Sequence, residues 1–333
     1  MRQHLTKFLG AAAVLSAFMP FSASALTISR PTYDYSVNPG DTVLDVLNIY
    51  NESPEALTVY PTLKNFGPDD KENGEPQFTD VKETPAEGDL AQWVSIDTKP
   101  LTIAPNERKS LTFTINVPKE SAAPGGHYGA ILLATTPPSQ KGQVGVASQL
   151  GALLLVNVSG NVTEAGSISQ FGFKNPQVWY ENLPIDFFLR FENSGNTHLR
   201  PTGSVVIEDM FGRKSADVIV NGAFASVLPR SIRRFEFGWH KKGFADAESG
   251  LVREWNNFGY GKYTATLVLN YGRSSNQIVT EQRVFYVWPW RIMLAVAIAG
   301  LVLLLLVWLT MRAHDRSVIR KYEKAKQAPP QKK

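Results

Sequence analysis

The segment Ser110-Leu-Thr-Phe-Thr-Ile-Asn-Val117 alternates apolar and polar side chains without a break. Its apolar members are Leu111, Phe113, Ile115 and Val117. Successive side chains of a β-strand point to opposite faces, so a period of two places all four on one face. The segment therefore predicts a strand with one face in a core and the other in solvent.

The same period recurs over much of the chain between residues 26 and 290. Residues 57–64, 185–191 and 263–271 alternate, while residues 43–49, 128–134 and 152–158 are denser apolar runs typical of inner strands. Turn-forming strings such as Asn38-Pro-Gly-Asp41 separate them. Apart from two terminal segments, no stretch shows a helical period. Many short strands joined by turns predict an all-β protein of immunoglobulin-like β-sandwiches.

A small, polar stretch at residues 158–166 separates two runs of predicted strands. It divides the exported part into a first sandwich at residues 26–160 and a second at residues 161–290. The chain contains no cysteine, so no disulfide can support either domain. Apolar cores must hold both sandwiches together.

The N-terminus has the three parts of a secretory signal peptide in order. Arg2 and Lys7 precede an apolar stretch at residues 8–21, and Ala23-Ser-Ala25 follows it. We predict a signal peptide at residues 1–25, with cleavage after Ala25.

Residues 292–311 contain no charged side chain. About 20 apolar residues are enough to cross roughly 30 Å of hydrocarbon, so residues 291–311 are predicted to form a transmembrane helix. The following residues, 312–333, carry eight Lys or Arg against Asp315 and Glu323. Basic residues beside a membrane span stay in the cytoplasm. The sequence therefore predicts a single-pass cell-membrane protein with a cytoplasmic basic tail and residues 26–290 outside.

The formal charge of +4 has its origin in this topology. Without the signal peptide, Arg291 and the tail, residues 26–290 carry about −5. The high isoelectric point is therefore no sign of nucleic-acid binding.

The exported part contains none of the common catalytic motifs. His127, His198 and His240 lie far apart, and neither H-E-x-x-H nor G-x-S-x-G occurs. No cysteine can act as a nucleophile or a zinc ligand. We predict a protein that is not an enzyme, with no catalytic residue, no cofactor and no metal motif.

Residues 67–92 form an acidic, proline-containing segment with eight Asp or Glu against two Lys. Its string Asp69-Asp-Lys-Glu-Asn-Gly74 imitates part of an EF-hand loop, but Lys71 stands where that motif needs an oxygen ligand. Two interpretations remain open: an irregular Ca²⁺ site, and a loop that is merely solvated.

The most distinctive string is Pro124-Gly-Gly-His-Tyr-Gly-Ala-Ile-Leu-Leu133. Gly125 and Gly126 let the chain turn sharply into a strand, and Gly129 lets a neighbouring group approach that strand closely. Pro124 and these glycines form the predicted turn motif.

His127 and Tyr128 stand at the start of the strand that follows this turn. Together with Trp93 they are our candidate ligand-binding residues, in a small contact patch at one end of the sandwich. The alternative is structural: a tight turn into a core strand, with Tyr128 packed and its hydroxyl hydrogen-bonded.

The order of these features resembles the WxL-interacting cell-surface proteins of Gram-positive bacteria. The likeness is most specific in Pro124-Gly-Gly-x-Tyr-Gly-Ala-Ile131, where Gly125, Gly126, Tyr128 and Gly129 match the family signature. The resemblance implies a first domain that binds peptidoglycan and a second that binds a partner surface protein or a host ligand. It implies no catalytic residue.

Two functions follow from this sequence. The first is a non-catalytic binding or adhesion scaffold on the cell surface that contacts peptidoglycan or another surface glycan and a partner protein. The alternative is a chaperone-like or assembly factor that captures a partner strand at an open sheet edge, with residues 110–117 as the expected edge.

Overall fold

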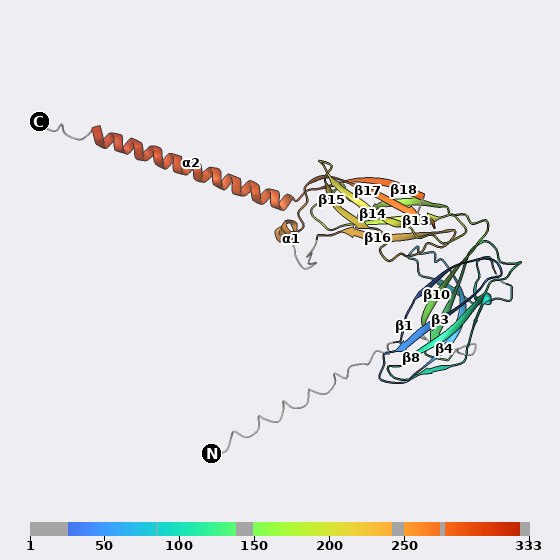
Figure 1. Cartoon of the computed structure of the whole chain (residues 1–333). Helices are drawn as coiled ribbons and strands as arrows, with labels where there is room; N and C mark the ends of the chain where they lie inside the picture. Colours follow the sequence, from blue (N-terminus) through green and yellow to red (C-terminus); the bar gives the residue numbers. More distant parts are fainter. Residues whose placement is uncertain (1–25, 85, 138–148, 242–249, 274–276, 327–333) are drawn as a thin grey trace, which may run out of the picture. The chain divides into compact units, whose positions relative to one another are not determined.

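The computed structural model describes residues 26–84, 86–137, 149–241, 250–273 and 277–326 (Figure 1). Two compact units make up the chain. Among the described residues, unit 1 lies within 26–71, 75–164 and 195–198, and unit 2 lies within 72–74, 165–194 and 199–326. The predicted signal peptide lies outside the described residues. Both units are immunoglobulin-like sandwiches, as the alternating sequence pattern predicts.

Unit 1 is built from two sheets. The first has the strand order β1-β3-β8-β6, and the second has the order β2-β10-β9-β4-β5 with β7 paired to β4. All pairs are antiparallel except β2 with β10, which is parallel. The strands are β1 (Leu26–Ile28), β2 (Thr32–Val37), β3 (Thr42–Asn51), β4 (Leu57–Gly67), β5 (Gln77–Thr79), β6 (Val94–Ile96), β7 (Leu101–Ile103), β8 (Arg108–Asn116), β9 (Gly125–Ala134) and β10 (Gln149–Val158).

The strand predicted at residues 110–117 is observed as β8. Its residues Leu111, Phe113 and Ile115 are buried, and Ser110 and Thr112 are exposed, which confirms the two predicted faces. The Phe113 ring packs against the ring of Tyr33, which belongs to the opposite sheet. The two rings are in an edge-to-face arrangement with centroids 5.3 Å apart. Such contacts between the inner faces form the core of unit 1.

Unit 2 packs a three-stranded sheet, β11-β13-β16, against a five-stranded sheet, β12-β18-β17-β14-β15. Aromatic rings fill its core, including Phe187 and Phe285. The strands are β11 (Gly166–Phe173), β12 (Trp179–Tyr180), β13 (Ile185–Asn193), β14 (Thr202–Asp209), β15 (Lys214–Ile219), β16 (Ser231–Trp239), β17 (Gly261–Tyr271) and β18 (Gln277–Val287).

Helix α2 (Trp290–Lys326) contains the predicted membrane span and continues 15 residues beyond the predicted end at residue 311. It is the one helix of the described residues that is long and apolar enough to cross a membrane. Its most apolar 18-residue window has a mean hydropathy of 3.0, and only 6% of that window is buried. A helix that exposes this much apolar surface is a candidate membrane span.

The structure corrects three sequence predictions. Strand β8 is not a sheet edge, because it lies between β3 and β6, and β6 pairs with it from Phe113 to Ile115. No helix was expected between the terminal segments, yet α1 (Gly250–Asn256) is present, at seven residues too short for a clear helical period. The acidic segment at residues 67–92 is not entirely loop, since it contains β5 and the start of the 3₁₀-helix η1 (Ala91–Trp93).

Replacement of a central core ring of unit 2 should destabilise that unit. Phe285 is 1% exposed and contacts five other rings, so Phe285→Ala should lower the free energy of unfolding by about 3–5 kcal/mol. Thermal unfolding of the detergent-solubilised chain measures this. The neighbouring Val284 is 48% exposed, and Val284→Ala is the matched control, with a change of about 0.5 kcal/mol or less. Equal effects of the two variants would contradict the assigned core.

Candidate functional site

The Pro124–Leu133 string forms nearly all of β9, so Gly125 and Gly126 lie inside the strand, paired with Val158 and Asn157, and not in the predicted turn before it. Gly125 has a φ of +116°, and a Cβ there would lie 2.5 Å from the Asn196 carbonyl oxygen. A Cβ on Gly126 would overlap the Tyr128 hydroxyl, and one on Gly129 would lie 3.2 Å from Leu90. The predicted close approach at Gly129 is therefore observed.

Two of the candidate ligand residues, His127 and Trp93, meet in the structure. Their ring centroids are 4.3 Å apart. The His127 nitrogens lie 2.9 Å from the Ala123 carbonyl oxygen and 3.2 Å from the Asp89 carbonyl oxygen, and the side chain is only 5% exposed. Both partners are carbonyl oxygens, so a neutral imidazole donates its single N–H to one of them at a time. Trp93 is half-buried against the core of unit 1.

Tyr128 lies on the opposite face of β9 and is 5% exposed. Its hydroxyl lies 3.4 Å from Nδ1 of His198, whose Nε2 lies 3.2 Å from the Asp34 carboxylate. Burial raises the pKa of the Tyr128 phenol well above its ordinary value, so the group stays protonated. Ligand binding by His127, Tyr128 and Trp93 stays a prediction. The burial of Tyr128 and the contact of its hydroxyl with His198 fit the structural alternative.

In the described part of the acidic segment, carboxylates pair with basic side chains. No group of three or more His, Asp or Glu is placed to hold a metal ion within the described ranges. Glu72 instead accepts hydrogen bonds from Arg190 Nε at 2.7 Å and Nη2 at 2.5 Å, and Asp80 pairs with Lys64. The Arg190 guanidinium holds the pKa of Glu72 below its ordinary value.

One inner strand of unit 1 has an open side. β10 pairs with β9 along its whole length but with β2 only from Leu153 to Val158. Among the described strands, residues 149–152 therefore pair through the backbone with β9 alone. The Leu153 N–H donates to the Pro31 carbonyl at 2.9 Å on that side. Because N–H directions alternate along a strand, the N–H groups of Gln149 and Gly151 face the open side too.

Other partly open edges carry charge. β12 covers β18 only at Tyr286 and Val287, and the rest of β18 carries the Glu281–Arg283 ion pair. The part of β8 that β6 leaves uncovered begins with Arg108 and Lys109. Charged side chains on an edge oppose pairing with other chains. The edge at residues 149–152 has the sequence Gln-Leu-Gly-Ala and lacks this protection.

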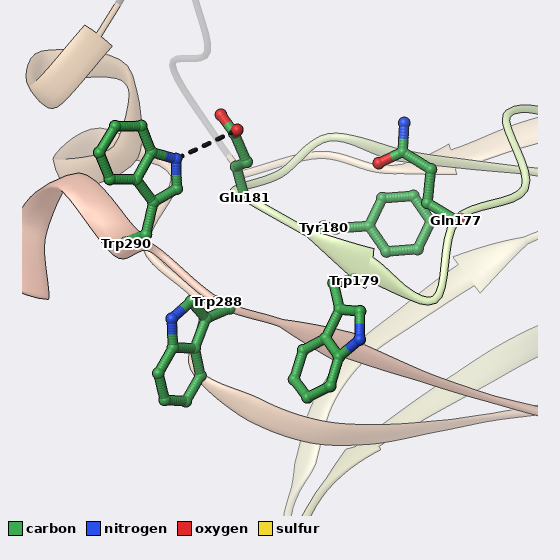
Figure 2. A pocket seen from close by; sticks show the side chains of 6 residues that line it. All are labelled: Gln177, Trp179, Tyr180, Glu181, Trp288 and Trp290. Carbon is green, nitrogen blue, oxygen red and sulfur yellow. Dashed lines mark hydrogen bonds between the residues drawn. The ribbon is translucent and has the colours of Figure 1, made fainter.

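A pocket of about 490 Å³ lies in unit 2 where β12 runs beside the end of β18 (Figure 2). Three of its lining residues are tryptophans. Trp290 Nε1 donates to Glu181 Oε1 at 3.1 Å, and Arg291 donates to the other Glu181 oxygen at 2.8 Å. The pocket is lined by Gln177, Trp179, Tyr180, Glu181, Trp288 and Trp290.

The first turn of α2 is fastened to α1 by a buried carboxylate. Glu254 is fully buried and accepts from Arg291 Nη1 at 2.9 Å and from the Ile292 N–H at 3.0 Å. The first N–H groups of a helix have no partner within the helix, and a carboxylate there also interacts favourably with the helix dipole. Sequence patterns gave no sign of this contact, because its partners are 38 residues apart.

Comparisons with known proteins give no family assignment. No family model matches the chain, and no curated protein matches it. Among solved structures, the class 5 fimbriae chaperone CfaA has a TM-score of 0.37 and 11% identity, over 78% of this chain and 99% of that one. The Pseudomonas aeruginosa CupB2 chaperone has a TM-score of 0.34 and 12% identity, over 78% of this chain and all of that one. The E. coli chaperone DraB has a TM-score of 0.32 and 11% identity, over 79% and 97%.

The Glu181 contacts predict a titration in the acid range. The hydrogen bonds from Trp290 and Arg291 lower the pKa of Glu181, so its carboxylate stabilises this junction above the unfolded pKa. That stabilisation is lost as the pH falls through the folded pKa, below the usual glutamate value of about 4.3. In detergent micelles, the indole N–H resonance of Trp290 should shift with this midpoint.

The matched control is Glu181→Gln, which retains a side-chain oxygen but cannot ionise. It should abolish the shift of the Trp290 resonance without unfolding unit 2. The same acid transition in both proteins would show that another group controls this indole.

Proposed function

We propose that this chain is a membrane-anchored, non-catalytic binding protein whose first sandwich captures an extended segment of a partner protein by strand addition. The segment would pair with β10 at residues 149–152 and extend the sheet beyond the end of β2. Strand addition supplies affinity through backbone hydrogen bonds and specificity through alternate side chains.

The open side of β10 is the observation that carries this proposal. The N–H groups of Gln149 and Gly151 face away from β9, in line with the Leu153 N–H that bonds to β2. A partner strand would continue the ladder that β2 begins. Backbone donors and acceptors of a sheet edge are a ready template for such pairing.

The side chains at this edge also favour a close neighbour. A Cβ on Gly151 would lie 2.4 Å from Leu132 Cδ2, so a side chain at this position would have to displace Leu132. A glycine in a strand leaves space for another backbone to approach closely. Leu150 and Leu153, both partly buried, add apolar surface beside it.

The membrane anchor in this proposal is α2. Its uncharged stretch at residues 292–311 is long enough to span the hydrocarbon, and the basic residues after it favour a cytoplasmic C-terminus. Both sandwiches would then lie outside, where a partner at the cell surface can reach β10. The family resemblance adds peptidoglycan as a proposed ligand of unit 1, for which the sequence motif is the support.

Removal of one edge donor should weaken partner capture. A photo-crosslinking amino acid at Leu150 of the full chain should yield a protein adduct in cells, with the crosslink in an extended segment of the partner. Gln149→Pro removes one outward N–H at the first residue of the strand, where proline is tolerated. One hydrogen bond is worth about 0.5–1.5 kcal/mol, so capture should fall about two- to tenfold.

The control variant is Gln149→Ala, which keeps the N–H and should keep the adduct. An adduct that carries glycan and no peptide, or equal capture by both variants, would refute strand addition at β10.

A further inference from the structure

Helix α1 buries its acidic side chain and exposes its apolar ones, which is the opposite of what a water-facing helix does. Its carboxylate, Glu254, is fully buried, while Leu251, Val252 and Trp255 are 49%, 57% and 72% exposed. A surface helix of a soluble domain normally presents polar residues outward and buries the apolar ones. This arrangement suits surroundings less polar than water.

The position of α1 along α2 is fixed by a hydrogen bond. The Glu254 carboxylate accepts the N–H of Ile292, the first residue of the uncharged stretch at 292–311. α1 therefore lies beside the point where the candidate membrane span begins, as Figure 1 shows. The charged partners Arg291 and Glu181 lie at the same level.

Exposed aromatic side chains surround this junction, and we refer to them as the aromatic collar. Trp288 contacts both Trp179, with centroids 6.3 Å apart, and Tyr260, at 5.5 Å. The same tryptophans line the pocket in Figure 2. All members are 40–72% exposed: Trp179, Trp255, Phe258, Tyr260, Trp288 and Trp290.

We propose that the aromatic collar and the outer face of α1 are a lipid-docking surface, inserted into the headgroup and upper acyl region of the bilayer that α2 crosses. The sandwich of unit 2 would thus contact the membrane surface directly, in addition to its covalent connection to α2. The inference rests on the proposed span of α2, and goes beyond it by assigning a lipid-binding role to residues of the ectodomain.

The chemistry of the surface favours lipid as its occupant. Tryptophan and tyrosine are enriched at membrane interfaces, where one part of the ring system meets hydrocarbon and the polar group meets water. Short amphipathic helices lie in the same zone with their apolar face toward the acyl chains. Because the collar is continuous with the first turn of α2, an inserted α2 brings it to the bilayer without a further binding step.

Single-cysteine labelling tests this directly, because the chain contains no cysteine of its own. The full chain is reconstituted into phosphatidylcholine–phosphatidylglycerol vesicles and labelled with an environment-sensitive NBD fluorophore. Val252→Cys reports on α1, and Trp179→Cys reports on the collar. Both labels should show blue-shifted emission and strong quenching by lipids that carry a doxyl group near the headgroup.

Two further positions are the controls. Phe211→Cys, 73% exposed at the turn between β14 and β15, should give water-like emission without quenching. Leu301→Cys, in the middle of the uncharged stretch, should be quenched by lipids with a deeper doxyl group.

Three results would overturn the proposal. If Val252 and Trp179 labels behave like the Phe211 label while the Leu301 label is quenched, α2 spans the bilayer but the collar stays in water. Blue-shifted emission without quenching would mean that protein covers the collar. An unquenched label at Leu301 would instead show that the span itself, and with it the proposed anchoring, is wrong.

Discussion

Both sandwiches depend on apolar side chains packed between two sheets, because no covalent link crosses either core. The chain has no cysteine, so burial of surfaces such as Phe113 against Tyr33, and Phe285 against its ring neighbours, must offset the entropy lost on folding. The alternation of apolar and polar residues along each strand puts these side chains on one face. Strand register follows from the same requirement, since a slip by one residue would turn the apolar set outward.

Core packing does not provide hydrogen-bond partners for the backbone groups at the edges of the sheets. These groups can pair with other chains unless the edge is protected. Short edge strands such as β1 and β6, and the Glu281–Arg283 pair on β18, limit unwanted pairing. Residues 149–152 of β10 lack such protection and direct two N–H groups outward. This contrast with the charged edges is the reason for which partner capture is proposed at β10.

The sandwich of unit 2 has a water-exposed surface, whereas α2 has an apolar surface. The residues at their junction provide partners for the polar groups that lie between these two surfaces. Glu254 supplies a partner for the Ile292 N–H and for Arg291, and Glu181 binds both Arg291 and Trp290. The polar groups are thereby satisfied inward, while the aromatic rings face out. In the proposed functions, anchoring and lipid docking are properties of one continuous surface, and partner capture belongs to the other unit.

Several features could be predicted from sequence because they depend on local periodicity. A period of two predicts the strands and their buried faces, and an uncharged stretch of 20 residues predicts the candidate span. The close approach to the strand at Gly129 was also visible, whereas Gly125 and Gly126 belong to the strand and not to a turn. These signals arise from residues that are near one another in the chain.

Tertiary structure alone decided the rest. The neighbours of β8, the open side of β10 and the Glu254–Ile292 contact each depend on strand order or on segments far apart in sequence. The environment of His127 and Tyr128 shows the same limit, because a turn motif does not reveal which groups will cover its side chains. Apolar periodicity states which face of a strand is buried, but only the assembled sheets determine which backbone and side-chain groups remain without cover.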